Sequence, residues 1–93
     1  MKKKLLYVSS LTEFVSKDTG ELVKGGRIAI CDPEPSYSNS GNGCYTEIIW
    51  VNERILNSLL SNSKCKDLPS DVEVILENRG IKTKPVVSGV EFM

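Results

Sequence analysis

The residues most clearly suited to binding a ligand are six basic side chains in two separated stretches of the chain. The first stretch holds Lys17, Lys24 and Arg27, and the second holds Arg79, Lys82 and Lys84. Ammonium and guanidinium groups bind phosphate oxygens, so a fold that brings the two stretches together would form a site for an anionic backbone. Charged turns also keep a surface soluble, and the sequence leaves that interpretation open.

Flat side chains that could stack on nucleic-acid bases are the second ingredient. Such stacking is worth about 1–3 kcal/mol per base. We assign it to Phe14 beside a predicted hairpin tip, to Tyr37 in a polar segment and to Tyr45. Tyr7 and Trp50 are further candidates. Alternation does not settle which face of its strand Trp50 takes, and a single tryptophan in a small barrel more often belongs to the core.

Other chemistry is poorly represented. The chain has no histidine, which excludes Ser-His and Cys-His nucleophile pairs and argues against the common zinc and copper sites. Cys31, Cys44 and Cys65 lack the spacing of a zinc knuckle, and Cys31 lies in an apolar stretch typical of a core. Asp32 and Glu34 are interpreted as solvated loop residues. We therefore expect no enzyme activity, no cofactor and no metal.

Size and composition set the frame. Ninety-three residues make one domain, 1–93, and 12 basic residues balance 12 acidic ones, so only a local basic patch could attract an anionic partner. The apolar run after the N-terminal lysines is too short for a signal peptide, and no stretch reaches membrane-span length. The odd number of cysteines favours a reduced compartment. We expect a soluble, cytoplasmic protein that does not contact membranes.

The first half of the chain predicts two strands and a loop. The first strand covers about residues 3–16, with a break in alternation at Ser9–Leu11 that indicates a bulge or bend. A turn at 17–21 leads to a strand at 22–31, where Gly25 and Gly26 indicate a bulge or a close approach. Residues 32–43 read as an irregular loop that is either functional or disordered.

The second half predicts a strand, a helix and two strands. The third strand covers about 44–51, and a helix follows, capped by Asn52, starting at Glu53 and ending near 61–62. Its apolar stripe is Ile55, Leu56, Leu59 and Leu60. Strands at about 71–77 and 84–92 flank a turn.

The order strand-strand-strand-helix-strand-strand is that of the five-stranded OB barrel, so we expect a mostly β fold with one short helix between strands three and four. OB barrels bind ligands across strands two and three, between the loops that join strands one to two and four to five. Both basic stretches fall on those strands and loops.

The chain resembles small single-stranded-DNA-binding proteins of bacteriophages and bacterial mobile elements. The resemblance lies in the lysine-led first strand from Lys2 to Val8, the hairpin from Ser16 to Leu22 and the late strand from Lys84 to Val87. It implies an OB fold, cooperative non-specific binding, homodimers and a role in DNA replication. The zero net charge departs from the pattern, and no diagnostic motif is matched.

The leading hypothesis is therefore non-sequence-specific binding of single-stranded DNA in replication or recombination. The six basic residues would meet phosphates, and Phe14, Tyr37 and Tyr45 would stack on bases. The alternative is a small β-barrel that binds another protein through an edge strand without contacting nucleic acid. The balanced charge and the apolar C-terminal strand favour that alternative.

Overall fold

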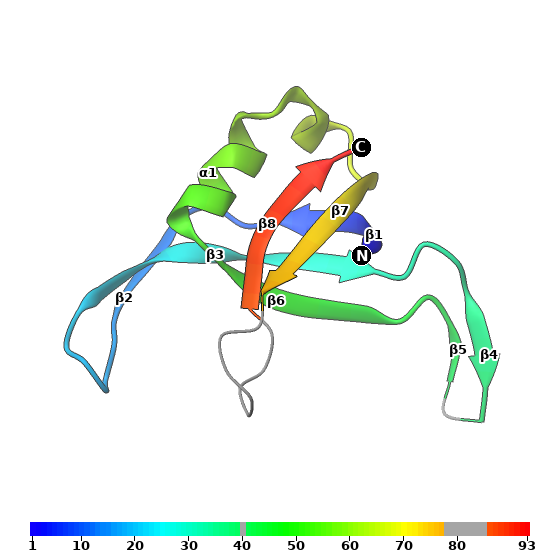
Figure 1. The fold of residues 1–93 in the computed structure, drawn as a ribbon, viewed down its shortest axis with the longest axis horizontal. Coiled ribbons are helices and arrows are strands. Elements are labelled where there is room, and N and C mark those ends of the chain that lie inside the picture. The colour runs from blue at the N-terminus through cyan, green and yellow to red at the C-terminus, as the bar shows by residue number, and fades with distance from the viewer. Residues whose placement is uncertain (40, 78–85) are drawn as a thin grey trace.

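The fold is described by a computed structural model that covers residues 1–39, 41–77 and 86–93. Its elements in chain order (Figure 1) are β1 (Lys2–Val8), β2 (Thr12–Val15), β3 (Leu22–Cys31), β4 (Ser36–Ser38), β5 (Gly41–Gly43), β6 (Thr46–Asn52), α1 (Glu53–Ser61), the 3₁₀-helix η1 (Ser63–Lys66), β7 (Ser70–Glu77) and β8 (Val86–Phe92). The expectation of a mostly β fold with a helix before the last two long strands is confirmed.

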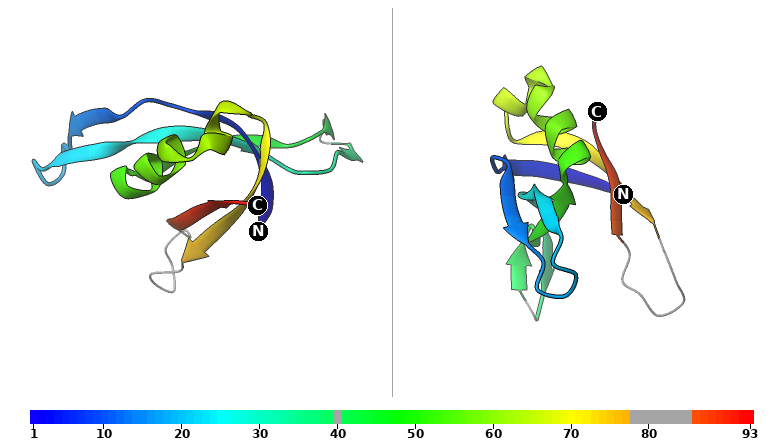
Figure 2. Two further views of the ribbon diagram at one scale, coloured as in Figure 1. Left: turned by 90° about the horizontal axis from the view of Figure 1, so that it is seen from above. Right: turned by 90° about the vertical axis from the view of Figure 1, so that its left-hand side faces the viewer.

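One antiparallel sheet contains all the long strands. Its neighbours run in the order β6, β3, β1, β7, β8, and β2 continues beyond β1 to pair with the first half of β3. Figure 2 shows the sheet bending so that β7 and β8 lie on the same side of β1 and β3 as α1. The space between these two layers holds the core.

The sheet is not closed into a barrel, because no described residues of β6 and β8 pair with each other. A hollow of about 460 Å³ lies between β6 and the β7–β8 pair instead. Side chains from both sides line it, including Ile49 of β6, Leu76 of β7 and Val87 of β8. The closed barrel expected from the sequence is therefore not seen in the described residues.

The first strand is broken as its alternation predicted. The β1–β3 register shifts between Leu5 and Tyr7, which leaves Leu6 as an extra residue, and the ladder stops between Val8 and Thr12. A bulge bends a strand and increases its twist. The bend lets β1 follow the curved sheet while β2 leaves it as part of a projecting hairpin (Figure 1). Gly20 closes that hairpin with φ +71°, the left-handed backbone expected of the turn.

The core consists of apolar side chains that point inward from the strands of the sheet and from α1. Leu5, Ile28, Ile30, Val51, Val72, Val74 and Val90 of the sheet pack with Ile55, Leu56 and Leu59 of α1. The Asn52 side chain caps α1 by accepting a hydrogen bond of 2.9 Å from the Ile55 N–H, as predicted. Leu60 is 43% exposed, so the prediction that the helix buries all four stripe residues is wrong at this position. At 3.6 residues per turn, Leu60 lies at one edge of the stripe, about 140° around the helix from Ile55, and turns away from the sheet in the last turn.

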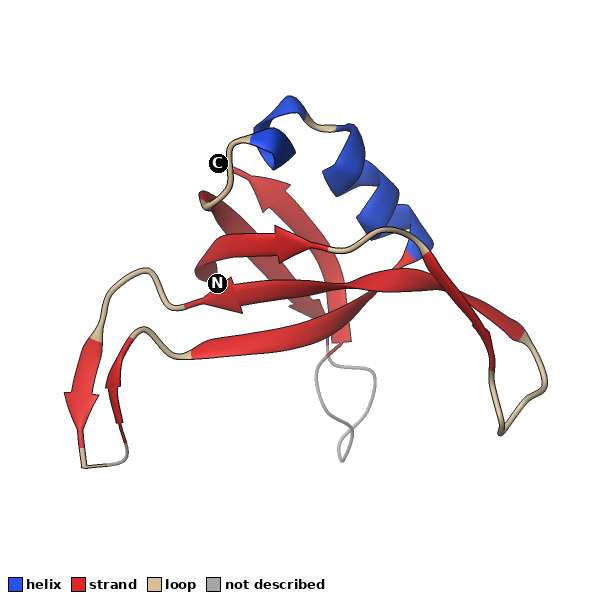
Figure 3. Ribbon diagram, turned by 180° about the vertical axis from the view of Figure 1, so that it is seen from behind, coloured by secondary structure: helices blue, strands red, loops and turns tan. Residues whose placement is uncertain are grey.

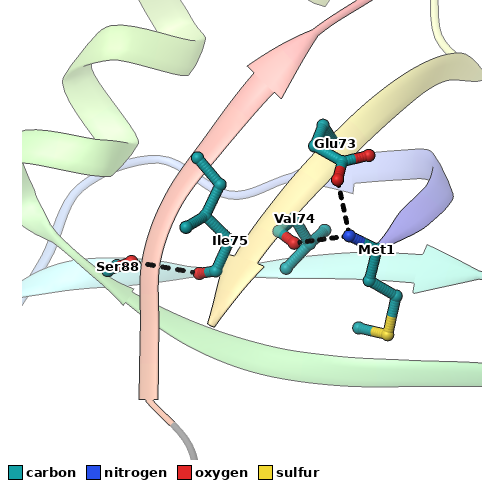
Figure 4. Close-up of polar contacts among 5 residues, drawn as sticks. All are labelled: Met1, Glu73, Val74, Ile75 and Ser88. Atoms are coloured by element: carbon teal, nitrogen blue, oxygen red, sulfur yellow. Dashed lines mark hydrogen bonds and ion pairs between the residues drawn. The ribbon is translucent and has the colours of Figure 1, made fainter. Parts of the chain in front are cut away.

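β7 is held on both sides by polar contacts (Figure 4). The Met1 amino group donates to Glu73 Oε1 at 2.7 Å and to the Val74 carbonyl at 3.1 Å, and the Ser88 hydroxyl of β8 donates to the Ile75 carbonyl at 3.3 Å. These contacts fasten the start of β1 and the middle of β8 to the same strand. They keep the β7–β8 pair over the core.

The segment predicted to be an irregular loop contains a second, two-stranded sheet. β4 and β5 pair with Tyr37 opposite Asn42, and Gly43 ends the hairpin with φ +108°. The sequence did not predict these strands, because the segment is polar and a three-residue strand is too short to show alternation. The cysteines are free, and Cys31 is buried as predicted, but it lies outside the core cluster, on the outward side of β3 by alternation. No helix in the described ranges is long and apolar enough to cross a membrane.

Removing the helix cap tests this packing. We expect Asn52→Ala to lower the free energy of unfolding by about 1 kcal/mol, because an N–H at the start of α1 loses its acceptor. Urea denaturation followed by circular dichroism measures the change. Asn57→Ala, on an exposed position of the same helix, is the control and should leave stability unchanged or slightly raised. Equal losses in both variants would contradict the capping role.

Candidate functional site

The outward face of β1, β3 and β6 is the candidate site. Figure 3 views this face directly, and no described helix or strand crosses in front of it, since α1, β7 and β8 lie behind. In the ladder, Arg27 lies opposite Trp50, while Ala29 lies opposite both Tyr7 and Ile48. Directly opposite residues of antiparallel strands project on the same side. Arg27, Trp50, Tyr7 and Ile48 therefore share one face, opposite the core.

A hollow of about 300 Å³ forms where these residues meet. Its lining consists of Tyr7, Ser9, Thr12, Arg27, Ala29, Ile48 and Trp50. Ile48 is 70% exposed and Tyr7 is 59% exposed. Apolar and aromatic surface left open on a sheet face is unusual for a folded chain and marks a binding surface more often than other surfaces do.

Trp50 is held in place by its neighbours. Its ring meets the Phe14 ring edge to face, with centroids 5.4 Å apart and an interplanar angle of 71°. The ring also lies over Gly25, where an added Cβ would be 2.7 Å from it and closer still to the Val51 carbonyl oxygen. Trp50 keeps 37% of its surface exposed. The tryptophan is thus supported by the sheet on one side and open on another.

Gly26 likewise leaves room for close neighbours, on the opposite face of β3. A Cβ there would lie 2.7 Å from Ser9 Oγ and 2.8 Å from a methyl group of Leu56 on α1. The two glycines let an aromatic ring and a helix approach β3 from opposite sides, while the β3–β6 register stays regular. Of the two interpretations of this pair, the close approach is confirmed and the bulge is wrong.

Arg27 is an exposed cation with a fixed backbone. Its N–H donates to Ser9 Oγ and its carbonyl accepts from the Ser9 N–H, both at 2.9 Å. Within residues 1–39, 41–77 and 86–93, the guanidinium forms no ion pair. Its charge is therefore free to meet an anionic ligand beside the aromatic rings.

The residues predicted from the sequence lie in different parts of the structure. Phe14 and Arg27 lie at the outward face. Lys17 lies exposed in the β2–β3 turn, and Lys24 approaches Glu13 of β2 at 3.7 Å, on the face of β3 opposite to Arg27 by alternation. Three predicted basic residues, namely Arg79, Lys82 and Lys84, lie outside the described residues.

The other two predicted aromatic residues lie away from the hollow. Tyr37 belongs to β4 and is 76% exposed, and Tyr45 is 67% exposed in the link between β5 and β6. Neither residue lines the hollow.

Sequence reasoning left three contributors to the hollow unassigned. Tyr7 and Trp50 were considered as stacking candidates but not assigned to the site, with Trp50 favoured as core, and Ile48 was not considered. The useful signal was the alternation of Arg27 with the apolar Ile28 and Ile30, because a charged residue marks the solvent side of its strand. Pairing with β6 then carries that face to Trp50, but the register of the pair cannot be read from one strand alone.

Within the described ranges, no three histidine, cysteine, aspartate or glutamate side chains cluster closely enough to hold a metal ion. No family model, curated protein or solved structure matches the chain. The argument for function therefore depends on the site itself.

Gly25→Ala tests the support of Trp50. The new methyl group would overlap a backbone oxygen and the indole, so we expect a loss of about 1–3 kcal/mol in the free energy of unfolding. The emission of Trp50, the only tryptophan in the chain, should shift as the ring moves. Gly41→Ala is the control, because nothing lies within 4 Å of an added Cβ there. An unchanged emission spectrum in Gly25→Ala would contradict this geometry.

Proposed function

We propose that this protein binds single-stranded DNA without sequence preference and acts in replication or recombination. The observation that carries the proposal is the uncovered face on which Trp50, Tyr7 and Ile48 surround the unpaired Arg27. Single-strand binding needs flat surfaces that accept any base, together with cations that follow the backbone. This face supplies both within one shallow hollow.

The strand order supports the same proposal. The sequence of neighbours β6, β3, β1, β7, β8 is that of an OB sheet opened between its third and fifth strands. On this assignment β3 and β6 are the second and third strands, whose outward face binds oligonucleotides in OB folds. We therefore propose an open OB-like barrel in which the hollow occupies the usual ligand face.

Binding would join stacking to charge neutralisation. Bases would stack on the open side of Trp50 and on Tyr7, while Phe14 supports the indole edge to face. The Arg27 guanidinium would contact a phosphate between them. Basic contacts to phosphates release counterions, so affinity should fall as salt concentration rises. Contacts from Lys17, Lys24, Arg79, Lys82 and Lys84 and stacking by Tyr37 and Tyr45 remain part of the proposal, as does a homodimer.

A titration with oligo-dT tests the proposal directly. We expect the emission of Trp50 to be quenched on binding, because the indole is the proposed stacking surface, and we expect the affinity to weaken as salt rises. Tryptophan fluorescence at several salt concentrations gives both quantities. The proposal is wrong if the protein shows neither quenching nor measurable affinity at low salt.

Two substitutions test the role of the hollow. We expect Tyr7→Ala to raise the Kd for oligo-dT by roughly 5- to 150-fold, which corresponds to the loss of one stacked base, about 1–3 kcal/mol. Arg27→Gln should weaken binding and reduce its salt dependence, because one phosphate contact is lost.

Lys66→Gln is the matched control for the charge change, since Lys66 is exposed on η1 and does not line the hollow. Urea denaturation of each variant shows whether it is folded. If Tyr7→Ala and Arg27→Gln are both folded and bind oligo-dT like the wild type, the bound strand does not lie on this face.

The open sheet favours a second candidate, a protein-interaction module. Among described residues β6 and β8 each pair with only one other strand, so each presents an unpaired edge. Such an edge can take up a strand from another protein. A partner that copurifies with the protein, together with indifference to oligo-dT, would select this function.

A further inference from the structure

A second hollow, rich in lysine, lies near the start of β1. It has a volume of about 630 Å³, and its charged lining consists of Lys2, Lys3 and Lys4 of β1, Lys64 of η1 and Asp71 of β7. None of these lysines was assigned to the predicted nucleic-acid site. The fold assembles these lysines from two elements far apart in the sequence, so the cluster is not visible as one motif.

The balance of charge in this hollow is positive. Lys3 is held by Asp32 in a partly buried ion pair, and Lys64 Nζ donates to the Met93 carbonyl at 2.6 Å. Lys2 and Lys4 form no ion pair with any described residue.

The nearby carboxylates do not cancel this charge. Asp71 lies opposite Lys4 in the β1–β7 ladder and is the one carboxylate side chain in the lining. Glu73, which lies opposite Lys2, is already engaged by the Met1 amino group at 2.7 Å. The two free ammonium groups therefore exceed the single free carboxylate.

The register joins the second hollow to the aromatic face. Lys4 lies opposite Cys31 in β3, and Tyr7 lies opposite Ala29, which is the next outward residue along β3. Successive residues on one face of a strand are about 7 Å apart. The extra residue at Leu6 allows this match, since without it Tyr7 would point to the inward side. The outward face therefore continues from Trp50 through Tyr7 to Lys4 and Lys2.

We infer that the lysine hollow receives backbone phosphates of the strand whose bases stack at Tyr7 and Trp50. This inference rests on the proposed function and adds a contact surface beyond the aromatic hollow. A compact ammonium on a flexible stem suits a phosphate whose position varies with sequence. The absence of aromatic residues in the described lining fits a role toward the backbone alone. Binding would then extend along β1 from the aromatic side chains to the lysine hollow.

The test compares Lys4→Gln and the double variant Lys2→Gln/Lys4→Gln with the wild type, using oligo-dT and Trp50 fluorescence. Each lost phosphate contact should reduce the slope of log Kobs against log salt by about 0.7, so the double variant should lose about 1.4. The quenching at saturation should stay unchanged, since stacking is not altered. Lys66→Gln should leave the slope at the wild-type value.

The outcomes separate this inference from the proposed function. Wild-type slopes in both folded lysine variants, combined with weaker binding by Tyr7→Ala, would overturn the lysine hollow and leave the proposed function standing. A wild-type protein that does not bind oligo-dT at low salt would overturn both. A slope that falls equally in Lys66→Gln would show a general charge effect and would also overturn the assignment to this hollow.

Discussion

The close packing around Gly25 and Gly26 is the constraint on which the rest of the structure depends. Because these two residues have no side chains, the Trp50 ring can lie against one face of β3 and Leu56 of α1 can reach the other. Side chains at either position would push the ring or the helix away from the sheet. The same two residues therefore fix the height of the helix over the core and the depth of the aromatic hollow. Core packing and the candidate site are linked through one short segment.

The unpaired edges of β6 and β8 are the basis of the second candidate function, the binding of another protein. A closed barrel has no unpaired edge, whereas in the described residues β6 and β8 each have one, and a largely apolar hollow separates these two edges. Protein partners and nucleic acid would use different parts of the surface, because the edges and the outward face of β1, β3 and β6 do not coincide. The two candidate functions are thus physically compatible, and the outward face combines aromatic rings with Arg27, which has no ion pair among the described residues.

Electrostatics in this protein are local. The chain has no net charge, and yet Arg27, Lys2 and Lys4 lie without ion pairs among the described residues along one face. Glu73, opposite Lys2, is engaged by the N-terminus, which leaves Asp71, opposite Lys4, as the one carboxylate side chain in the lining of the lysine hollow. Exposed charges act over about 8–10 Å at ordinary salt, so the arrangement within such a distance matters more than the total.

The sequence by itself determined the local elements. Asn52 and the apolar spacing predicted α1, and the turn at Gly20 predicted the β2–β3 hairpin. The break in alternation after Val8 predicted the bent first strand. Each of these features depends on residues that are neighbours in the chain. Only the tertiary structure decided which face Trp50 takes, that Tyr7 joins it, and that the sheet stays open. Those outcomes depend on register between strands far apart in the sequence, and a shift of one residue would turn every side chain to the other face.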